Sequence, residues 1–435
     1  MNQGTRLAGC IVRAVALSVG LGLAAGTASG DDREPLPVDR LPIDQIRAFG
    51  EIFDLVKEQY IHPVDDRELL EDAIRGMVSG LDPHSAYLTA EEHRELQEGT
   101  SGEFGGLGIE ITAEDGLIRI ITPLDDSPAL DAGLLPGDLV TRVDGESVRD
   151  LTATEAAKRI RGQPGTPVTL TILREEEEGP LEFTIVRDIV EIASVKSELV
   201  EPGFARIRVS RFQTQTGARL LEAIRRVEEA NGSPLAGAVL DLRNNPGGIL
   251  SGAISVADAF LDDGLIVYTE GRDPDSREEY YAKPSDFLSG VPIVALVNGG
   301  SASAAEIVAG ALQDRRRAVI AGSRTFGKGS IQTIVSLDDG SALKLTTNRY
   351  YTPSGHSIQA RGIIPDIELP PLRIEVADRG ASILEGNLLG HLESDDRADP
   401  DTASAASAES LAVEDFALFQ AINLLKGLAL QRPGA

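Results

Sequence analysis

The chain has 435 residues, of which 42% are hydrophobic and 25% are charged, and its formal net charge is -28 at pH 7. This length is sufficient for two or three domains, each with its own core. Acidic residues outnumber basic ones 69 to 41, and no basic stripe is present to neutralise phosphates. These features argue against nucleic-acid binding and indicate a solvated acidic surface.

Residues 1–30 have the three parts of a secretory signal peptide. Arg6 and Arg13 precede the apolar run 14–25, and small residues follow at 26–30. The apolar run is too short for a comfortable membrane span. We therefore expect an export signal that is removed from the mature protein.

Cys10 is the only cysteine, and it lies inside this signal. The sequence Leu7-Ala-Gly-Cys10 matches a lipoprotein acylation box, but no apolar run precedes it, so we interpret the match as chance. The mature chain then has no cysteine for a disulfide, a metal site or a nucleophile.

Residues 31–100 are predicted to form a small helical segment. Apolar residues recur there every three or four positions, as on one face of a helix. The expected helices are 43–60, 66–79 and 90–98, with a turn at 81–87. Such a segment is too small to form a core by itself, so we expect it to pack on another domain or another subunit.

Residues 101–189 predict a compact, β-rich module. Short alternating strands are separated by Asp-Gly turns at 115–116 and 144–145. One helix is expected to begin at Thr152, where a Thr-x-x-Glu capping box ends at Glu155.

The motif Gly106-Leu-Gly-Ile109, followed by Ser-Pro-Ala, Ala-Gly-Leu, Gly-Asp and Val-Asp-Gly elements, resembles a bacterial PDZ domain. This resemblance implies that the module binds an extended peptide as an added strand and holds its terminal carboxylate with backbone N–H groups. The carboxylate loop would be formed by Leu107, Gly108 and Ile109. The side-chain pocket would be lined by Ile109, Ile111 and Ile160.

Residues 190–371 alternate between strands and helices, which predicts an α/β domain with a largely parallel sheet. The loops 243–248 and 298–303 each follow an expected strand, where functional loops of such sheets lie. Residues 372–408 are polar and predicted to be a disordered linker. Residues 409–435 are expected to carry a final helix. The predicted fold class is therefore a multidomain α/β protein.

Ser303 lies at a strand-to-helix corner that is filled with small residues. Free N–H groups at the start of a helix stabilise an oxyanion, so Ser303 is a candidate nucleophile. A serine at a helix start is more often only an N-cap. Residues elsewhere in the sequence that could act together with a nucleophilic serine decide between the two roles.

The segment from Gly322 to Gly329 nearly matches a phosphate-binding P-loop. Gly329 stands where the Mg²⁺-binding hydroxyl belongs, and a strand pattern follows instead of a helix, so we reject nucleotide binding. Lys328 remains available as a base for a serine, provided that burial lowers its pKa from about 10.4. Phe326 and the neighbouring glycines suit such burial.

Two motifs, Gly300-Ser-Ala-Ser-Ala-Ala-Glu306 and Phe326-Gly-Lys-Gly-Ser-Ile-Gln332, resemble the carboxy-terminal processing (tail-specific) serine protease family. The order of signal, helices, PDZ module and core agrees with this family. The match covers nearly all of the mature chain except its polar tail.

This resemblance implies a role for each matching residue. Ser303 would be the nucleophile, Lys328 the general base and Gln332 its orienting partner. Glu306 would support the site. The oxyanion hole would combine the N–H of Ala304 with that of Gly247 or Gly248.

The implied function is that of a periplasmic serine endopeptidase without a cofactor or metal, which cleaves protein substrates near their C-termini. Membrane association, a homo-oligomer, an adaptor or activator protein, and gating by the PDZ module are left open. The main alternative is a catalytically dead PDZ adaptor that only binds tails. The intact set Ser303, Lys328 and Gln332 argues against it.

Overall fold

The computed structural model describes residues 42–431 except 115, 125–126, 176, 371 and 373–409. The predicted signal peptide and most of the predicted polar linker lie outside this range. The described residues divide into two compact units, one up to Glu71 and the other from Asp72 onwards. Within the described part of the chain, no helix is long and apolar enough to cross a membrane.

The first unit contains α1 (Ile43–Gln59) and the beginning of α2 (Asp66–Ser79), as the apolar spacing predicted. The Nζ atom of Lys57 lies 2.8 Å from a carboxylate oxygen of Asp66. No residue of α1 is buried, and Phe49 on its apolar face is 48% exposed. The expected partner of this face is therefore not found within the unit.

In the second unit, α2 is followed by a strand that the sequence did not predict. Residues 81–87 were expected to form a turn, but β1 (Ala86–Leu88) pairs antiparallel with β18 (Ala342–Tyr351). Three residues are too few to show a strand periodicity, and the partner strand is distant in sequence. Next, α3 (Ala90–Ser101) begins with a capping box between Thr89 and Glu92.

The β-rich module has a sheet in the order β3-β4-β5-β7-β8, with β6 paired to β5. The short strands β2 and β9 pair with each other where the chain enters and leaves the module. Its elements are β2 (Glu103–Gly106), β3 (Ile109–Glu114), β4 (Leu117–Pro123), α4 (Pro128–Asp131), β5 (Leu139–Val143), β6 (Glu146–Ser147), α5 (Ala153–Ile160), β7 (Pro167–Leu173), β8 (Leu181–Val186) and β9 (Asp188–Glu191). β3 is an edge strand of this sheet, and α5 packs against it.

The α/β core contains a six-stranded sheet in the order β10-β11-β12-β15-β16-β19. All neighbours are parallel except β10 and β11. Its strands are β10 (Val195–Glu201), β11 (Phe204–Val209), β12 (Gly237–Asp241), β15 (Ile293–Val297), β16 (Ala318–Gly322) and β19 (Ile367–Glu368). The expectation of a largely parallel sheet is confirmed.

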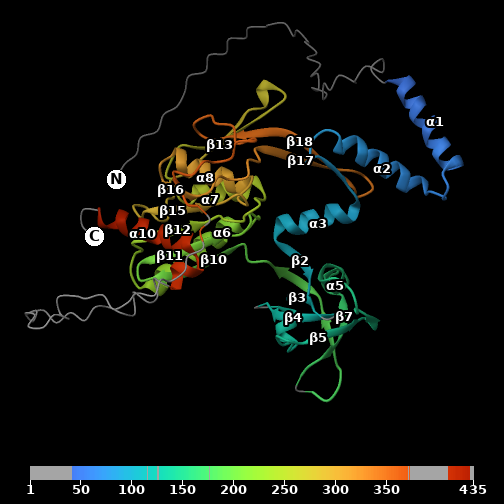
Figure 1. Cartoon of the computed structure of the whole chain (residues 1–435), viewed down its shortest axis with the longest axis horizontal. Helices are drawn as coiled ribbons and strands as arrows, with labels where there is room; N and C mark the ends of the chain where they lie inside the picture. The colour runs from blue at the N-terminus through green and yellow to red at the C-terminus, as the bar shows by residue number, and fades with distance from the viewer. Residues whose placement is uncertain are drawn as a thin grey trace, which may run out of the picture. The chain divides into compact units, whose positions relative to one another are not determined.

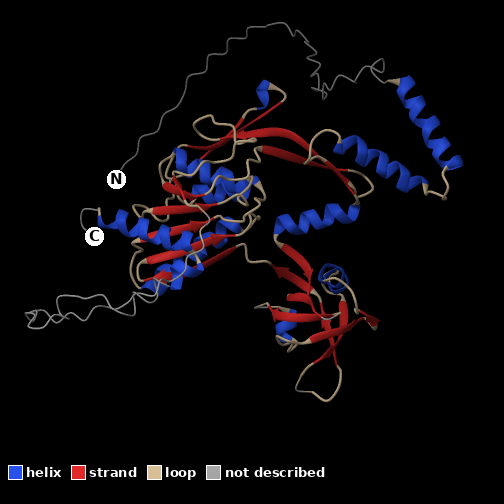
Figure 2. Cartoon of the chain, in the orientation of Figure 1, coloured by secondary structure: helices blue, strands red, loops and turns tan. Residues whose placement is uncertain are grey.

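Helices cover both faces of this sheet (Figures 1 and 2). On one face, α6 (Thr216–Asn231), α7 (Leu250–Asp258) and α8 (Ala304–Asp314) form the largest hydrophobic cluster with alternate strand residues. On the other face, α10 (Phe416–Leu430) packs on the intervening residues Val239, Val294 and Leu296. Every residue of β12 and β15 is buried, and all of them except Asp241 at the end of β12 are apolar, as expected for strands that are covered on both faces.

A second, antiparallel sheet lies beside the first. Its order is β1-β18-β13-β14, and β17 also pairs with β18. The hairpin of β17 (Ser330–Ser336) and β18 was predicted, whereas β13 (Leu265–Gly271), η2 (Pro274–Ser276) and β14 (Glu278–Tyr281) were not. Strand β17 of this sheet begins at Ser330, two residues after Lys328.

We expect the packing of α10 on the sheet to contribute to the stability of the core. Leu425 is fully buried in the cluster with Val239 and Leu296. Leu425→Ala should lower the free energy of unfolding by about 2 to 5 kcal/mol, because it leaves a cavity. The control Leu430→Ala removes a side chain that is 86% exposed and should change it by less than about 0.5 kcal/mol. Equal values for the two variants in urea denaturation would contradict the docking of α10.

Candidate active site

Ser303 occupies a strained corner between β15 and α8. Its φ is 56° and its ψ is -114°, a conformation that non-glycine residues rarely adopt. The N–H of Glu306, in the first turn of α8, donates to the backbone carbonyl of Ser303 at 2.9 Å. The Ser303 hydroxyl is therefore not needed as its acceptor. The Ser303 hydroxyl instead lies 2.7 Å from the hydroxyl of Tyr350.

The neighbouring Ser301 has a structural part in this corner. Its hydroxyl donates to the carbonyl of Leu242 at 2.8 Å and accepts from the N–H of Asn298 at 2.9 Å. Ser301 is completely buried, whereas Ser303 keeps 7% of its surface exposed. Of the two serines, only Ser303 combines a strained backbone with residual exposure.

The carboxylate of Glu306 is the main polar link of the site. It is completely buried and accepts hydrogen bonds from the Ser303 N–H at 2.7 Å, the Gly327 N–H at 2.7 Å and the Lys328 N–H at 2.8 Å. The Thr325 hydroxyl donates a fourth hydrogen bond at 2.6 Å. One side chain therefore joins the Ser303 corner to the loop that carries Lys328.

Lys328 is half-buried, and burial lowers the pKa of its amine below the ordinary value. The nearby positive charge of Lys344 lowers the pKa further, and the negative charge of Asp82 opposes both effects. Phe326, which was expected to help bury the lysine, is 64% exposed. Among the described residues, no side chain accepts a hydrogen bond from Lys328 Nζ, and the Ser303 hydroxyl does not bond to it either.

Gln332 lies on β17, and its side-chain amide does not bond to Lys328 in this geometry. The amide nitrogen donates to the hydroxyls of Ser330 at 3.1 Å and Thr346 at 3.2 Å. Thr346 in turn donates to the carboxylate of Asp82 at 3.1 Å. Glu306 joins the backbone of Lys328 to the serine corner, but the side chains of Lys328 and Gln332 do not bond to each other.

Two residues near the site had no signal in the sequence. Tyr350 is 4% exposed, and burial raises the pKa of its hydroxyl to about 12, so it stays neutral beside Ser303. The Tyr350 N–H donates to the carbonyl of Gly329 at 2.9 Å. Asp82 comes from the segment before β1, and hydrogen bonds, first of all from Ser85, lower the pKa of its carboxyl to about 2. Only strand pairing brings these residues here.

The loop from Arg243 to Gly248 lies against the serine corner. A Cβ added to Gly247 would lie 2.8 Å from both Ser303 Cβ and the Ala302 carbonyl oxygen, so only glycine allows this approach. The Gly247 N–H already donates to Asn245 Oδ1 at 2.9 Å. The N–H groups of Gly248 and Ala304 have no acceptor within the described residues. Gly248 is therefore the better placed of the two glycines to bind an oxyanion.

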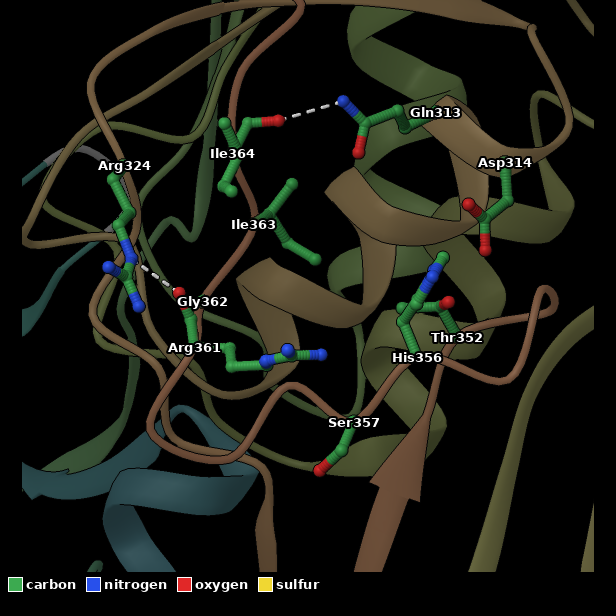
Figure 3. Close-up of a pocket in the computed structure, with 10 residues that line it drawn as sticks. All are labelled: Gln313, Asp314, Arg324, Thr352, His356, Ser357, Arg361, Gly362, Ile363 and Ile364. Atoms are coloured by element: carbon green, nitrogen blue, oxygen red, sulfur yellow. Dashed lines mark hydrogen bonds between the residues drawn. The ribbon is translucent and has the colours of Figure 1, made fainter.

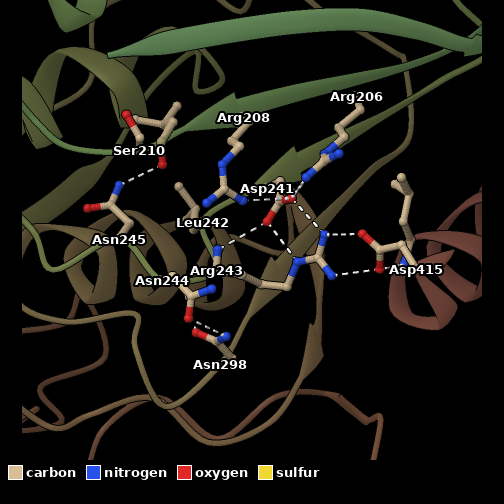
Figure 4. A network of polar contacts seen from close by, with 12 residues as sticks. Arg206, Arg208, Ser210, Asp241, Leu242, Arg243, Asn244, Asn245, Asn298 and Asp415 are labelled. Atoms are coloured by element: carbon tan, nitrogen blue, oxygen red, sulfur yellow. Dashed lines mark hydrogen bonds and ion pairs between the residues drawn. The ribbon is translucent and has the colours of Figure 1, made fainter. Parts of the chain in front are cut away.

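A charged network holds the beginning of this loop (Figure 4). Asp241 is completely buried and accepts hydrogen bonds from Arg206, Arg208 and Arg243. Burial by itself would raise the pKa of Asp241, but the arginines, Arg243 foremost, lower it to about 2. Asn244 and Asn298 then exchange hydrogen bonds of 2.9 Å between the two loops.

In the β-rich module, the predicted tail-binding residues lie around β3. Leu107 is 1% exposed and Ile160 is 4% exposed, so their side chains belong to the core of the module. Ile109 and Ile111 on β3 are partly buried against the same cluster. Gly108 has a φ of 74°, which glycine adopts readily. The free edge of β3 next to α5 is the arrangement that strand addition requires.

A separate cavity of about 460 Å³ contains none of the predicted site residues (Figure 3). Its walls include Gln313, Asp314, His356 and Arg361. The Ser354 hydroxyl lies between the Asp314 carboxylate at 2.7 Å and His356 Nδ1 at 2.8 Å. His356 therefore bonds to Ser354 and not to Ser303.

Family models match three parts of the chain. The model for peptidase family S41 matches residues 203–369, and that for the PDZ domain matches residues 105–185. A model described as the N-terminal domain of the activating protease CtpB matches residues 27–92.

Curated relatives match most of the chain. A carboxy-terminal-processing protease of Bartonella bacilliformis is 46% identical over 385 residues, which is 88% of each chain. A carboxyl-terminal-processing protease of Synechocystis is 39% identical over 72% of this chain and 74% of that protein. A solved structure titled photosystem II D1 C-terminal processing protease has 31% identity over 74% of this chain and 92% of that chain. The TM-score of this comparison is 0.44.

We expect Glu306→Gln to damage the site because an amide NH₂ would face backbone donors. The lost charge-assisted hydrogen bonds should lower the free energy of unfolding by about 3 kcal/mol. The displaced corner should slow labelling of Ser303 by a fluorophosphonate on the order of 100-fold. The exposed control Glu222→Gln should change neither value. Labelling of Glu306→Gln at the normal rate would show that the carboxylate does not order the site.

Proposed function

Because this chain belongs to the carboxy-terminal processing serine proteases of peptidase family S41, we propose that it cleaves exported proteins near their C-termini with Ser303 as nucleophile and Lys328 as general base. The observation that carries this proposal is the buried Glu306 carboxylate, which binds the N–H groups of both residues. Nucleophile and base are thereby held on one rigid polar link.

The proposed reaction begins with proton transfer. Neutral Lys328 takes the proton of the Ser303 hydroxyl, and Ser303 Oγ forms a bond to the carbonyl carbon of the scissile peptide. The N–H groups of Ala304 and Gly248 stabilise the oxyanion. The C–N bond of the peptide then breaks as the Lys328 ammonium gives its proton to the leaving amine, which leaves an acyl-enzyme. Neutral Lys328 next takes a proton from water, the hydroxide attacks the acyl carbon, and the C–Oγ bond breaks as the proton returns to Ser303 Oγ.

This sequence requires a local rearrangement from the geometry described above. The Ser303 hydroxyl must leave Tyr350, and the Lys328 amine must approach it. Gln332 is proposed to orient Lys328, in which case its amide exchanges Ser330 and Thr346 for the lysine. Substrate binding is the natural source of the free energy for this change.

A tail-binding adaptor without activity is the second candidate. The separation of the Ser303 hydroxyl from Lys328 Nζ in this geometry favours it. Labelling of Ser303 by a serine-directed probe distinguishes the two, since an inactive adaptor would not be labelled.

The proposed substrate is a protein with a free C-terminal tail. The free edge of β3 is proposed to accept the tail as an added strand, and the N–H groups of Leu107, Gly108 and Ile109 to bind its carboxylate. An aliphatic terminal residue would contact Ile109, Ile111 and Ile160. No nucleic acid is involved, in keeping with the net charge of -28.

We also propose that residues 1–30 direct export to the periplasm. The basic, apolar and small parts of this segment support the proposal. The exposed apolar face of α1, with Ile43 and Ile46 each about half exposed, supports a protein partner there, either a second copy of the chain or an activator.

Ser303→Ala and Lys328→Ala should each abolish proteolysis to a similar extent, because nucleophile and base act as a unit. The loss in kcat should be on the order of 10⁶-fold. Gln332→Ala should cost less, since its amide only orients. Cleavage of an unfolded substrate can be followed by gel and mass spectrometry. Near-normal turnover by Lys328→Ala at neutral pH would refute the proposed base.

Activity should rise with pH and then level off. Burial and the charge of Lys344 lower the pKa of Lys328, so the neutral base should form below the ordinary lysine pKa of about 10.4. Lys344→Gln removes one of these effects and should move the rise to higher pH. Lys196→Gln, on the exposed side of β10, should leave it in place. A profile that falls where the rise is expected would exclude a neutral lysine base.

Amidating the C-terminus of a peptide substrate should weaken cleavage, because the carboxylate that the loop of β3 binds is lost. Deleting about residues 102–188 then separates two roles of the module. A tether predicts poor cleavage of every tailed substrate, whereas a gate predicts faster cleavage of unstructured protein. Unchanged kinetics in both experiments would remove the module from substrate selection.

A further inference from the structure

The C-terminal helix α10 is joined to the charged network by one bidentate ion pair. Asp415 stands directly before α10, and its two carboxylate oxygens accept hydrogen bonds of 2.7 Å from the two terminal nitrogens of Arg243 (Figure 4). Asp415 also accepts the N–H of Leu418 at 3.0 Å and so caps the helix. Both side chains are largely shielded from water, with 16% of Arg243 and 25% of Asp415 exposed. A bidentate pair of this kind fixes orientation as well as distance.

Arg243 divides its guanidinium between two carboxylates. Its Nε donates to Asp241 at 2.9 Å and one terminal nitrogen donates to Asp241 at 2.7 Å, while the pair with Asp415 uses the outer edge. Asp241 also binds Arg206 and Arg208, so it has other cations if Arg243 moves. Among the described residues, Arg243 is the one basic side chain that forms an ion pair with Asp415. Loss of Asp415 would therefore free the outer edge of the Arg243 guanidinium, while its inner edge would stay bonded to Asp241.

Arg243 is the first residue of the loop that reaches the proposed oxyanion hole. Asn244 is bound to Asn298, and Asn245 donates to the Val209 carbonyl and accepts the Gly247 N–H. The carbonyl of Asn245 accepts the N–H of Ala302, directly before Ser303, at 2.9 Å. A displacement of Arg243 is thus transmitted through a few short bonds to the Gly248 N–H.

The attachment of α10 does not itself need this pair. Leu418, Ala421, Ile422 and Leu425 are buried against the sheet. Lys426 forms a separate ion pair with Glu201 at the other end of the contact. The apolar face supplies most of the docking energy, so a charged pair placed at the loop calls for another role.

We propose that Asp415 is a positioning residue for the reaction: docked through α10, it holds Arg243 and thereby sets the 243–248 loop whose Gly248 N–H receives the oxyanion. This inference rests on the proposed function, because it concerns the geometry of the proposed oxyanion hole. The C-terminal helix is then part of the catalytic framework, although it contributes no group that touches substrate.

The test compares Asp415→Asn with the wild-type full-length chain on a peptide ester substrate. Asparagine still caps a helix but offers a single oxygen and no charge to Arg243. We expect kcat to fall about tenfold, equivalent to about 1.4 kcal/mol in the barrier. KM should stay within about twofold, since an oxyanion forms only in the transition state. The pH midpoint should not move, because the surroundings of Lys328 are unchanged.

Two control variants separate positioning from stability. Lys426→Ala breaks the other ion pair of α10 and should leave kcat unchanged. Leu425→Ala loosens the same helix without touching Arg243, so it shows what destabilisation by itself does to kcat. Asp415→Glu restores the charge and should recover part of the rate. If Asp415→Asn does not fold, Asp415→Glu is the test variant, and it should show a smaller fall in kcat with an unchanged KM.

Three results would overturn the inference while leaving the proposed function in place. They are a normal kcat for Asp415→Asn, a loss no greater than that of an equally destabilised Leu425→Ala, and a loss that shifts KM or the pH midpoint as strongly as kcat. If the wild-type chain shows no turnover that Ser303→Ala abolishes, the proposed function fails and this inference fails with it.

Discussion

The buried carboxylate of Glu306 is the interaction on which the candidate site depends. It accepts three backbone N–H groups and one hydroxyl, which come from the Ser303 corner and from the loop of Lys328. A charge without exposure to water is tolerated only when its oxygens are fully hydrogen-bonded, so the two segments must keep this geometry for Glu306 to remain buried. The strained φ of Ser303 is then held by the same bonds that stabilise the carboxylate.

The site lies where two sheets of different kinds meet. The parallel sheet supplies the Ser303 corner and the 243–248 loop at the ends of adjacent strands β12 and β15. The antiparallel sheet supplies Tyr350 and the strand β17, which begins two residues after Lys328. The hydroxyl of Tyr350 bonds to that of Ser303 across this junction. The present partner of the Ser303 hydroxyl therefore comes from the other sheet and not from the Lys328 loop.

Charge is used differently on the two sides of the 243–248 loop. Towards Ser303, the loop has backbone N–H groups and glycines that allow close approach. Away from it, Asp241 gathers three arginines, and one of these extends the network to Asp415 before α10. Removing one member of such a network leaves a shielded charge without its partner, which is costly. The loop is consequently held from both the strand beneath it and the helix beyond it.

The sequence by itself determined the order of the parts, most helices and the parallel sheet, because these follow from local periodicity and turn chemistry. It indicated the candidate residues through motifs that resemble those of a known family. It did not reveal β1, β13 or β14, since short or irregular strands are specified by partners far along the chain. It also could not reveal that Tyr350 faces Ser303, that the Gly247 N–H is occupied by Asn245, or that Asp415 meets Arg243. Those contacts join segments widely separated in sequence, and only the packing of two sheets and the C-terminal helix brings them within hydrogen-bonding distance.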